Sequence, residues 1–184
     1  MADFKRLRRQ FKEDNNFLCY IPSGSDLGVA HKRASKMGAL NGSFTRGLGN
    51  MVGCLGELAI EKFLPRCRYV GDSHFSHDFV YKNKKVEVKS KSCASPPLPN
   101  YTASVNGHKS MCPNNDLYVF TRVRRDLMKV WVVGWIPTTL LLKKAQYRDK
   151  GYVDKDGFKT KSSGYHIAIE ELKPTLGLVW GVYK

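Results

Sequence analysis

Two neighbouring runs of β-branched and aromatic residues constrain the fold of this chain more than any other feature. Leu117 to Val123 and Lys129 to Trp135 are rich in Val, Tyr, Phe and Trp, and only Arg124-Arg125-Asp126 and its immediate neighbours separate them. Such residues favour strands, and a short polar connection between two strands favours a hairpin. The runs therefore predict a β-hairpin, against which the rest of the chain must pack.

Two helices are predicted before this hairpin. Asp26 is a candidate N-cap ahead of apolar residues at helical spacing, and Gly38 is a candidate C-cap. A second helical period runs over residues 45–64 and stops before Pro65. Glycines lie three or four residues apart on this second helix, which indicates either a close approach to that face or packing of the helix on a sheet: Gly49, Gly53 and Gly56.

The remaining elements are shorter. Residues 77–81 and 85–90 read as strands of a hairpin, joined by the polar turn Lys82-Asn83-Lys84. Residues 93–115 contain four prolines and no sustained period, which predicts a long loop with room for a short helix at 101–109. The last part of the chain is predicted to hold a short helix at 138–146, a polar loop at 147–164, a strand at 165–169 and a stretch without clear type at 172–180.

Length and charge limit the class of protein. A chain of 184 residues is typical of one domain, so we expect a basic N-terminal arm or helix over 1–24 and one α/β domain over 25–184. The 31 Lys and Arg residues outnumber the 16 Asp and Glu residues and give a net charge of +15. This excess favours a polyanionic partner, with nucleic acid before an anionic membrane surface.

The terminal and cysteine patterns exclude other classes. The basic N-terminus is not followed by the apolar region of a secretory signal, and no run approaches the roughly 18 apolar residues of a membrane span. We therefore expect a cytoplasmic protein. The five cysteines are widely spaced and form no CxxC pair, which argues against a disulfide framework and a structural zinc site.

The residues that carry chemistry lie in the first hairpin. Alternation in this strand buries Val86 and Val88 and projects Glu87 and Lys89 together on the opposite face. A two-residue turn at Asn83-Lys84 would place Asp78 opposite Lys89, and Val80 opposite Glu87. Two carboxylates and an ammonium group would then converge.

This combination suits the hydrolysis of a phosphodiester bond. The reaction needs a cation that withdraws charge from the phosphoryl oxygens and makes water more acidic. Mg²⁺ prefers oxygen ligands and is commonly held by one or two carboxylates, so Asp78 and Glu87 are sufficient in number. Lys89 would orient the attacking water or stabilise the developing charge.

The order of a helix glutamate (Glu57), an aspartate (Asp78) and Glu87-Val-Lys89 resembles the PD-(D/E)XK nuclease superfamily. The resemblance covers roughly residues 45–137. It implies a restriction-endonuclease-like α/β fold, with a central mixed β-sheet of four to five strands flanked by helices. It also implies a deoxyribonuclease that needs Mg²⁺ or Mn²⁺ and leaves a 5′-phosphate.

The same resemblance assigns roles to single residues. Asp78, Glu87 and the main-chain carbonyl of Val88 become metal ligands, Lys89 positions the water, and Glu57 is an accessory acid. His77 stands where the name of the superfamily records a proline. Two acids compete with these assignments, Asp72 for the role of Asp78 and Glu61 for the role of Glu57.

Several alternatives stay open. A non-catalytic nucleic-acid-binding protein with a nuclease-like fold, or a basic protein of the membrane surface, would carry the same charge. Branched, free-ended, flapped and sequence-specific DNA are all candidate substrates, and the sequence does not decide between a monomer and a homodimer. Five lysines are candidates for phosphate contacts, although a lysine-rich hairpin also protects a sheet edge: Lys82, Lys84, Lys85, Lys91 and Lys109.

Overall fold

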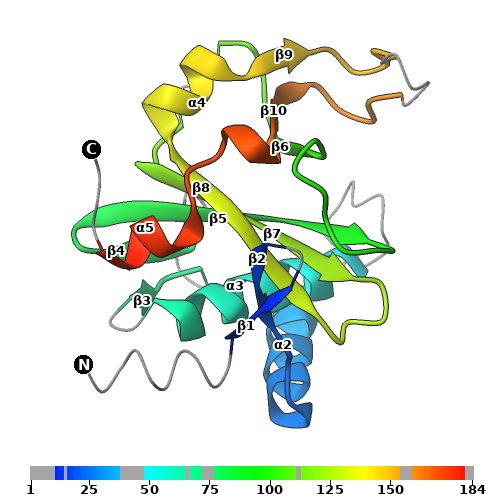
Figure 1. Cartoon of the computed structure of the whole chain (residues 1–184), viewed down its shortest axis with the longest axis vertical. Helices are drawn as coiled ribbons and strands as arrows, with labels where there is room; N and C mark the ends of the chain where they lie inside the picture. Colours follow the sequence, from blue (N-terminus) through cyan, green and yellow to red (C-terminus); the bar gives the residue numbers. More distant parts are fainter. Residues whose placement is uncertain are drawn as a thin grey trace.

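A central mixed sheet and a smaller antiparallel sheet organise the chain (Figure 1). The computed structural model describes residues 11–14, 16–37, 48–64, 67–71, 77–110, 113–153 and 159–180. The central sheet consists of β1 (Phe11–Asp14), β2 (Phe17–Tyr20), β3 (Arg68–Tyr69), β4 (Phe79–Tyr81), β5 (Lys84–Cys93), β7 (Leu117–Arg124) and β8 (Val130–Pro137). The small sheet consists of β6 (Thr102–Asn106), β9 (Gln146–Arg148) and β10 (Gly164–Ala168).

The strand order in the central sheet is β1-β2-β8-β7-β5-β4-β3, and in the small sheet β6-β10-β9. Only β5 and β7 pair in parallel among the strand pairs of the described chain. The predicted α/β class, with one mixed sheet flanked by helices, is confirmed. The sheet is larger than the expected four to five strands because β1, β2 and β3 extend its two edges.

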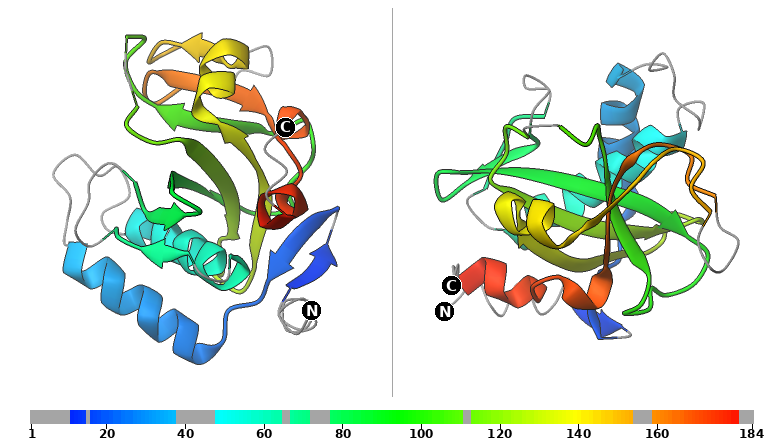
Figure 2. Two further views of the ribbon diagram at one scale, coloured as in Figure 1. Left: turned by 90° about the vertical axis from the view of Figure 1, so that its left-hand side faces the viewer. Right: turned by 90° about the horizontal axis from the view of Figure 1, so that it is seen from above.

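Helices and the small sheet cover opposite faces of the central sheet (Figure 2). Helix α3 (Leu48–Phe63) packs on one face, and α2 (Gly24–Met37) lies against α3. The small sheet and α4 (Thr138–Lys144) cover the other face, where Tyr118 and Phe120 of β7 meet Ala103 of β6 and Ile167 of β10. A 3₁₀ turn at Ile169–Glu171 and α5 (Thr175–Trp180) end the described chain.

The predicted central hairpin is confirmed as β7 and β8, whose residues are buried along almost their whole length. The second half of the chain also holds an unexpected strand. Residues 102–106, within the predicted long loop that left room for a short helix at 101–109, form the strand β6, because they pair with β10, more than fifty residues away. Ala103 and Val105 are buried by this pairing, and the intervening residues remain more accessible.

The N-terminal prediction is wrong for residues 11–20. They form the β1–β2 hairpin instead of a helix or arm, and β2 pairs with β8 through Leu18, Cys19 and Tyr20. Burial of Cys19 and Tyr20 against the sheet supplies the stabilising energy that an isolated arm would lack. Residues 1–10 lie outside the described part of the chain.

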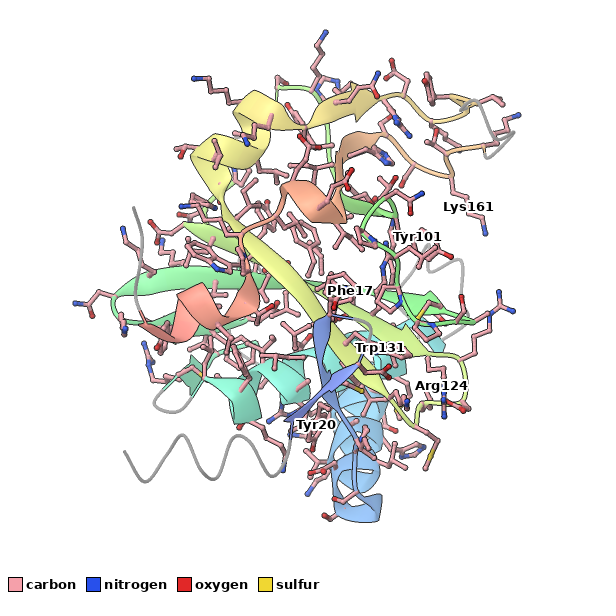
Figure 3. All side chains as sticks on the ribbon, viewed as in Figure 1. Phe17, Tyr20, Tyr101, Arg124, Trp131 and Lys161 are labelled. Atoms are coloured by element: carbon pink, nitrogen blue, oxygen red, sulfur yellow. The ribbon has the colours of Figure 1, made fainter. Side chains whose placement is uncertain are left out.

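The first turn of α2 is capped by Ser23, not by the predicted Asp26. The Ser23 Oγ atom accepts the N–H of Asp26, while the Asp26 carboxylate accepts the N–H of Ser23 at 2.9 Å, as in a capping box. The hydroxyl of Tyr20, which Figure 3 shows near the start of α2, also donates to Asp26. Burial raises the pKa of Asp26, but hydrogen bonds from Lys62, Tyr20 and Ser23 outweigh it and hold the pKa well below its usual value.

The β4–β5 hairpin turns at Lys82 and Asn83, whose φ angles of 48° and 60° are those of a type I′ turn. Phe79 faces Val86 and Tyr81 faces Lys84. The predicted turn at Asn83-Lys84 was therefore wrong by one position, and the pairing by two. A shift of two residues leaves every side chain of β5 on its predicted face.

Two further findings concern the chain as a whole. Within the described ranges, no helix is both long and apolar enough to cross a bilayer. The cysteines in these ranges, Cys19, Cys54, Cys67 and Cys93, carry free thiols.

Candidate active site

Four predicted residues meet where α3, the start of β4 and the middle of β5 come together. Asp78 immediately precedes β4, Glu87 and Lys89 lie on β5, and Glu57 lies on α3. The carboxyl group of Asp78 interacts electrostatically with the other three side chains. The structure therefore brings the predicted catalytic set into one site.

The carboxyl group of Asp78 is largely buried. Its carboxylate accepts the N–H of Val88 at 2.7 Å, beyond the short segment in which β4 pairs with β5. Burial, followed by the negative charges of Glu87 and Glu57, raises the pKa of Asp78 to about 8, although Val88 and Lys89 oppose the shift. Like charges thus surround a carboxyl group that is largely withdrawn from water.

Glu87 and Lys89 form an ion pair on the same face of β5. The Lys89 Nζ and Glu87 Oε1 atoms lie 2.5 Å apart, and the side chain of Lys89 is 38% exposed whereas that of Glu87 is 17% exposed. Val86 and Val88 point into the core, so the predicted alternation along β5 is confirmed. The negative charge of Glu87 adds to burial in raising the pKa of the neighbouring Tyr118 to about 12.

A short chain of contacts orients Glu57. The hydroxyl of Tyr69 on β3 donates to the Glu57 Oε2 atom at 3.2 Å. The guanidinium group of Arg33 lies over the Tyr69 ring at 4.1 Å and donates to the Glu61 Oε2 atom at 2.8 Å. Glu61 is thereby engaged in an ion pair with α2, whereas Glu57 is the helix acid that acts on Asp78. The other competitor, Asp72, lies outside the described residues.

Close packing of α3 on the sheet fixes the position of Glu57. A Cβ atom on Gly56 would lie 2.0 Å from the Ser90 Oγ atom and 2.4 Å from the Thr121 Oγ1 atom. A Cβ atom on Gly53 would meet only the Glu57 Oε1 atom, at 4.0 Å. The helix glycines were interpreted either as a site of close approach or as packing of the helix on a sheet, and for Gly56 the structure shows packing on the sheet. The surroundings of Gly49 lie outside the described side chains.

The donor set of this site fits a divalent cation. Glu57, Asp78 and Glu87 offer carboxylate oxygens, which Mg²⁺ and Mn²⁺ prefer. A cation would also relieve the repulsion that raises the pKa of Asp78. In the described chain no three His, Cys, Asp or Glu side chains are grouped closely enough to hold an ion by themselves. The Mg²⁺ ion usually keeps several waters and needs only one or two carboxylates.

The candidate phosphate-binding lysines fall into two groups. Lys91 lines a small hollow together with Lys89. The other four lysines lie away from that hollow. At the hairpin turn, Lys82 lies over the Tyr81 ring, and Lys84 forms an ion pair with Asp116 at 3.4 Å. Lys85 donates a hydrogen bond to Asn114 at 2.9 Å, and Lys109 lies on the segment after β6.

Sequence reasoning missed basic residues next to Lys91. Arg122 on β7 faces Lys91 in the parallel ladder, and His166 on β10 interacts electrostatically with both Lys91 and Arg148 of β9. Arg122 is the one signal that the sequence offered, because it is a charged residue inside an otherwise apolar strand run. The other two depend on the small sheet, whose pairing is not evident from the sequence.

No protein-family model matches this chain, and no curated protein matches it significantly. Its function is therefore inferred from its residues and their geometry.

Proposed function

We propose that the protein is a metal-dependent deoxyribonuclease of the PD-(D/E)XK type, which hydrolyses DNA phosphodiester bonds and leaves a 5′-phosphate. The observation that carries this proposal is the electrostatic interaction of Asp78 with Glu87, Glu57 and Lys89, together with the ion pair of Lys89 and Glu87. The mixed sheet flanked by helices is compatible with a restriction-endonuclease-like fold, and the net charge of +15 favours DNA as the partner.

Each side chain has a distinct role in this proposal. Asp78 and Glu87, with the carbonyl of Val88, would hold Mg²⁺ or Mn²⁺. Such an ion would supply Lewis-acid chemistry, which draws charge from phosphoryl oxygens and makes water more acidic. Lys89 orients the attacking water and stabilises charge that develops on the phosphate, and its ion pair with Glu87 keeps its ammonium group at the site. Glu57 acts as the accessory acid.

The first test is a comparison of DNA substrates. Supercoiled, linear, single-stranded and four-way-junction DNA are incubated with Mg²⁺ and, in parallel, with EDTA. We expect cutting of at least one substrate with Mg²⁺ and none with EDTA. Tight binding of DNA without any cutting would favour the alternative of a non-catalytic nucleic-acid-binding protein. Cutting that persists in EDTA would contradict the proposed metal dependence.

The Lys89→Met variant tests the chemistry itself. Because it removes the ammonium group that orients water, we expect the cutting rate to fall about 100-fold or more. DNA affinity should fall much less, since one of many basic residues is lost. Lys32→Gln, on the exposed surface of α2, removes the same charge away from the site and should keep the parental rate. Equal rates for Lys89→Met and the parent protein would exclude the role given to Lys89.

Tyr69→Phe tests the positioning of Glu57. The variant keeps the ring under Arg33 but removes the hydroxyl that donates to Glu57. One hydrogen bond is worth about 0.5–1.5 kcal/mol, so we expect the cutting rate to fall about 2- to 10-fold. The Mg²⁺ concentration for half-maximal rate should rise, whereas a purely structural role would lower the melting temperature and leave the Mg²⁺ dependence unchanged.

A further inference from the structure

A pair of basic side chains lies beside the candidate active site. Lys91 and Arg122 face each other across β5 and β7, and both line the small hollow that also contains Lys89 and Ser104. Lys91 follows Lys89 by two residues on the same strand, a separation of about 6.6 Å along the strand. A DNA strand whose scissile phosphate lies at Lys89 can therefore place a neighbouring phosphate at Lys91.

Neither member of this pair has a carboxylate partner in the part of the chain that the structure describes. Arg122 is only 8% exposed, and its guanidinium group donates to the carbonyl of Thr102 at 2.6 Å. Burial lowers the pKa of Arg122. Burial of its ammonium group and the charge of Arg122 lower the pKa of Lys91 to about 8, although Lys91 as a whole residue is exposed to solvent. Buried charges in proteins are normally paired, so the buried guanidinium group of Arg122, with the accessible Lys91 beside it and no acid, is suited to an anionic ligand.

The surface continues from this pair onto the small sheet. Strand pairing places Ser104, His166 and Gln146 in one row across β6, β10 and β9. Burial, then the charges of Lys91 and Arg148, lower the pKa of His166 to about 4, so its ring is neutral near pH 7. It can offer a hydrogen bond and a flat surface in place of a charge. The row thus connects the cationic pair to β9.

A groove lies at the far end of this row. Lys144, Arg148 and Tyr152 line it together with His166, and one acid, Glu171, also borders it. The guanidinium group of Arg148 lies 5.0 Å from the centre of the Tyr152 ring, and Tyr152 as a residue is 40% exposed. Basic side chains that alternate with accessible aromatic rings are typical of surfaces that bind single-stranded nucleic acid, since every base can stack on a ring.

We propose that Lys91 and Arg122 bind a backbone phosphate next to the scissile one, and that this single DNA strand continues past Ser104 and His166 into the groove at Arg148 and Tyr152. The position of this phosphate next to the cut rests on the proposed nuclease function, whereas binding of the strand does not. The face favours a single strand because the groove offers the accessible ring of Tyr152, the neutral ring of His166 and the separate cations Lys144 and Arg148.

Salt-dependent binding tests this path without any cutting. The affinity for a fluorescent oligothymidylate is measured in EDTA over a range of salt concentrations. Each lost phosphate contact lowers the slope of log affinity against log salt by about 0.7. We expect this decrease for Lys91→Gln and for Arg148→Gln, and a decrease near twice as large for the double variant. Lys32→Gln, which has the same charge change on α2, should keep the parental slope.

Arg122 is buried, so its replacement by Gln risks unfolding. Lys91 and Arg148 therefore carry the test, and Arg122→Lys serves as a conservative variant whose melting temperature is measured alongside. Parental slopes for both Lys91→Gln and Arg148→Gln would overturn the proposal. So would an equal loss of affinity for single-stranded and duplex DNA, because the path is assigned to a single strand.

A second arm separates this inference from the proposed function. Neutral methylphosphonate linkages replace single phosphates on either side of the cut position, and cutting is followed with Mg²⁺. One neighbouring linkage should slow the parent several-fold but hardly slow Lys91→Gln, which has already lost the contact. If the parent protein never cuts DNA but the salt slope still falls in Lys91→Gln and Arg148→Gln, strand binding is supported and the nuclease function is rejected. If the parent protein cuts DNA but both variants keep its salt slope, the nuclease function is supported and strand binding is rejected.

Discussion

Replacing Asp78 with Asn is expected to abolish DNA cutting and, at the same time, to make the metal-free protein more stable. Loss of this proposed metal ligand would remove several kcal/mol of transition-state stabilisation, or about 1000-fold in rate. Stability rises because folding near neutral pH must either keep a charge on this buried carboxyl group beside Glu87 and Glu57 or bind a proton to it, and Asn avoids both costs. Asn keeps an oxygen that can accept the N–H of Val88, so the local backbone is not disturbed.

The pH dependence of this effect has a definite sign. Folding raises the pKa of Asp78 from 3.8 to about 8, so the folded protein binds a proton more tightly than the unfolded chain does. The free energy of unfolding therefore falls as the pH rises from about 4 towards 8. We expect Asp78→Asn to gain about 1–3 kcal/mol at neutral pH, where each kcal/mol raises the melting temperature by about 2–4 °C. The gain should vanish near pH 4.

Urea unfolding in EDTA across this pH range measures the difference. Mg²⁺ should raise the melting temperature of the parent but not that of Asp78→Asn, which tests metal binding separately from catalysis. Asp126→Asn is the matched control, because Asp126 is an exposed acid paired with Arg124 on the β7–β8 turn. An Asp78→Asn variant that cuts DNA at the parental rate would remove the basis of the proposed site.

Gly56→Ala is expected to cause the largest loss of stability among substitutions of one small residue by another in this site. The added methyl group would overlap the Ser90 Oγ and Thr121 Oγ1 atoms, which are themselves hydrogen-bonded at 2.8 Å. Rotation of Ser90 breaks that hydrogen bond, and a shift of α3 carries Glu57 away from Asp78. Overpacking of this kind costs about 1–3 kcal/mol. The cutting rate should fall together with stability.

Gly53→Ala is the matched control on the same helix. Its methyl group meets nothing closer than 4.0 Å, so the higher helix propensity of Ala should leave stability equal or raise it by up to about 1 kcal/mol. Adding Ser90→Ala to Gly56→Ala removes the closest overlap and should restore part of the loss, which a double-mutant cycle of unfolding free energies measures. Equal stability of Gly53→Ala and Gly56→Ala would show that α3 does not approach the sheet so closely.

Elements with strong local patterns were predictable from the sequence. The β7–β8 hairpin, α3 and the alternation of Val86 and Val88 along β5 follow from periodicity and strand propensity, and the structure has all three. The gathering of Asp78, Glu87 and Lys89 followed from the same alternation. This prediction holds although the predicted turn position was wrong, because the pairing was in error by two residues and an even shift keeps each side chain on the same face of the strand.

The remaining elements depend on contacts between distant parts of the chain. Residues 102–106 become a strand only because β10 lies beside them, and residues 17–20 because β8 offers a free edge. Neither segment has a pattern that distinguishes it from a loop or a short helix. Arg122 has the same difficulty, since its position beside Lys91 depends on the parallel pairing of β5 with β7. Long-range pairing is the information that one sequence does not display.

The tight turn at Lys82 and Asn83 constrains how relatives of this protein can differ in length. Phe79 and Tyr81 on one strand and Val86 and Val88 on the other all enter the same core. An inserted or deleted residue in the turn would force one of these pairs out into water or would carry Glu87 to the helix side of the sheet. Natural variants are therefore expected to keep turn residues that tolerate positive φ, such as Asn, Asp and Gly, and to keep the interval between the two carboxylates proposed to bind metal.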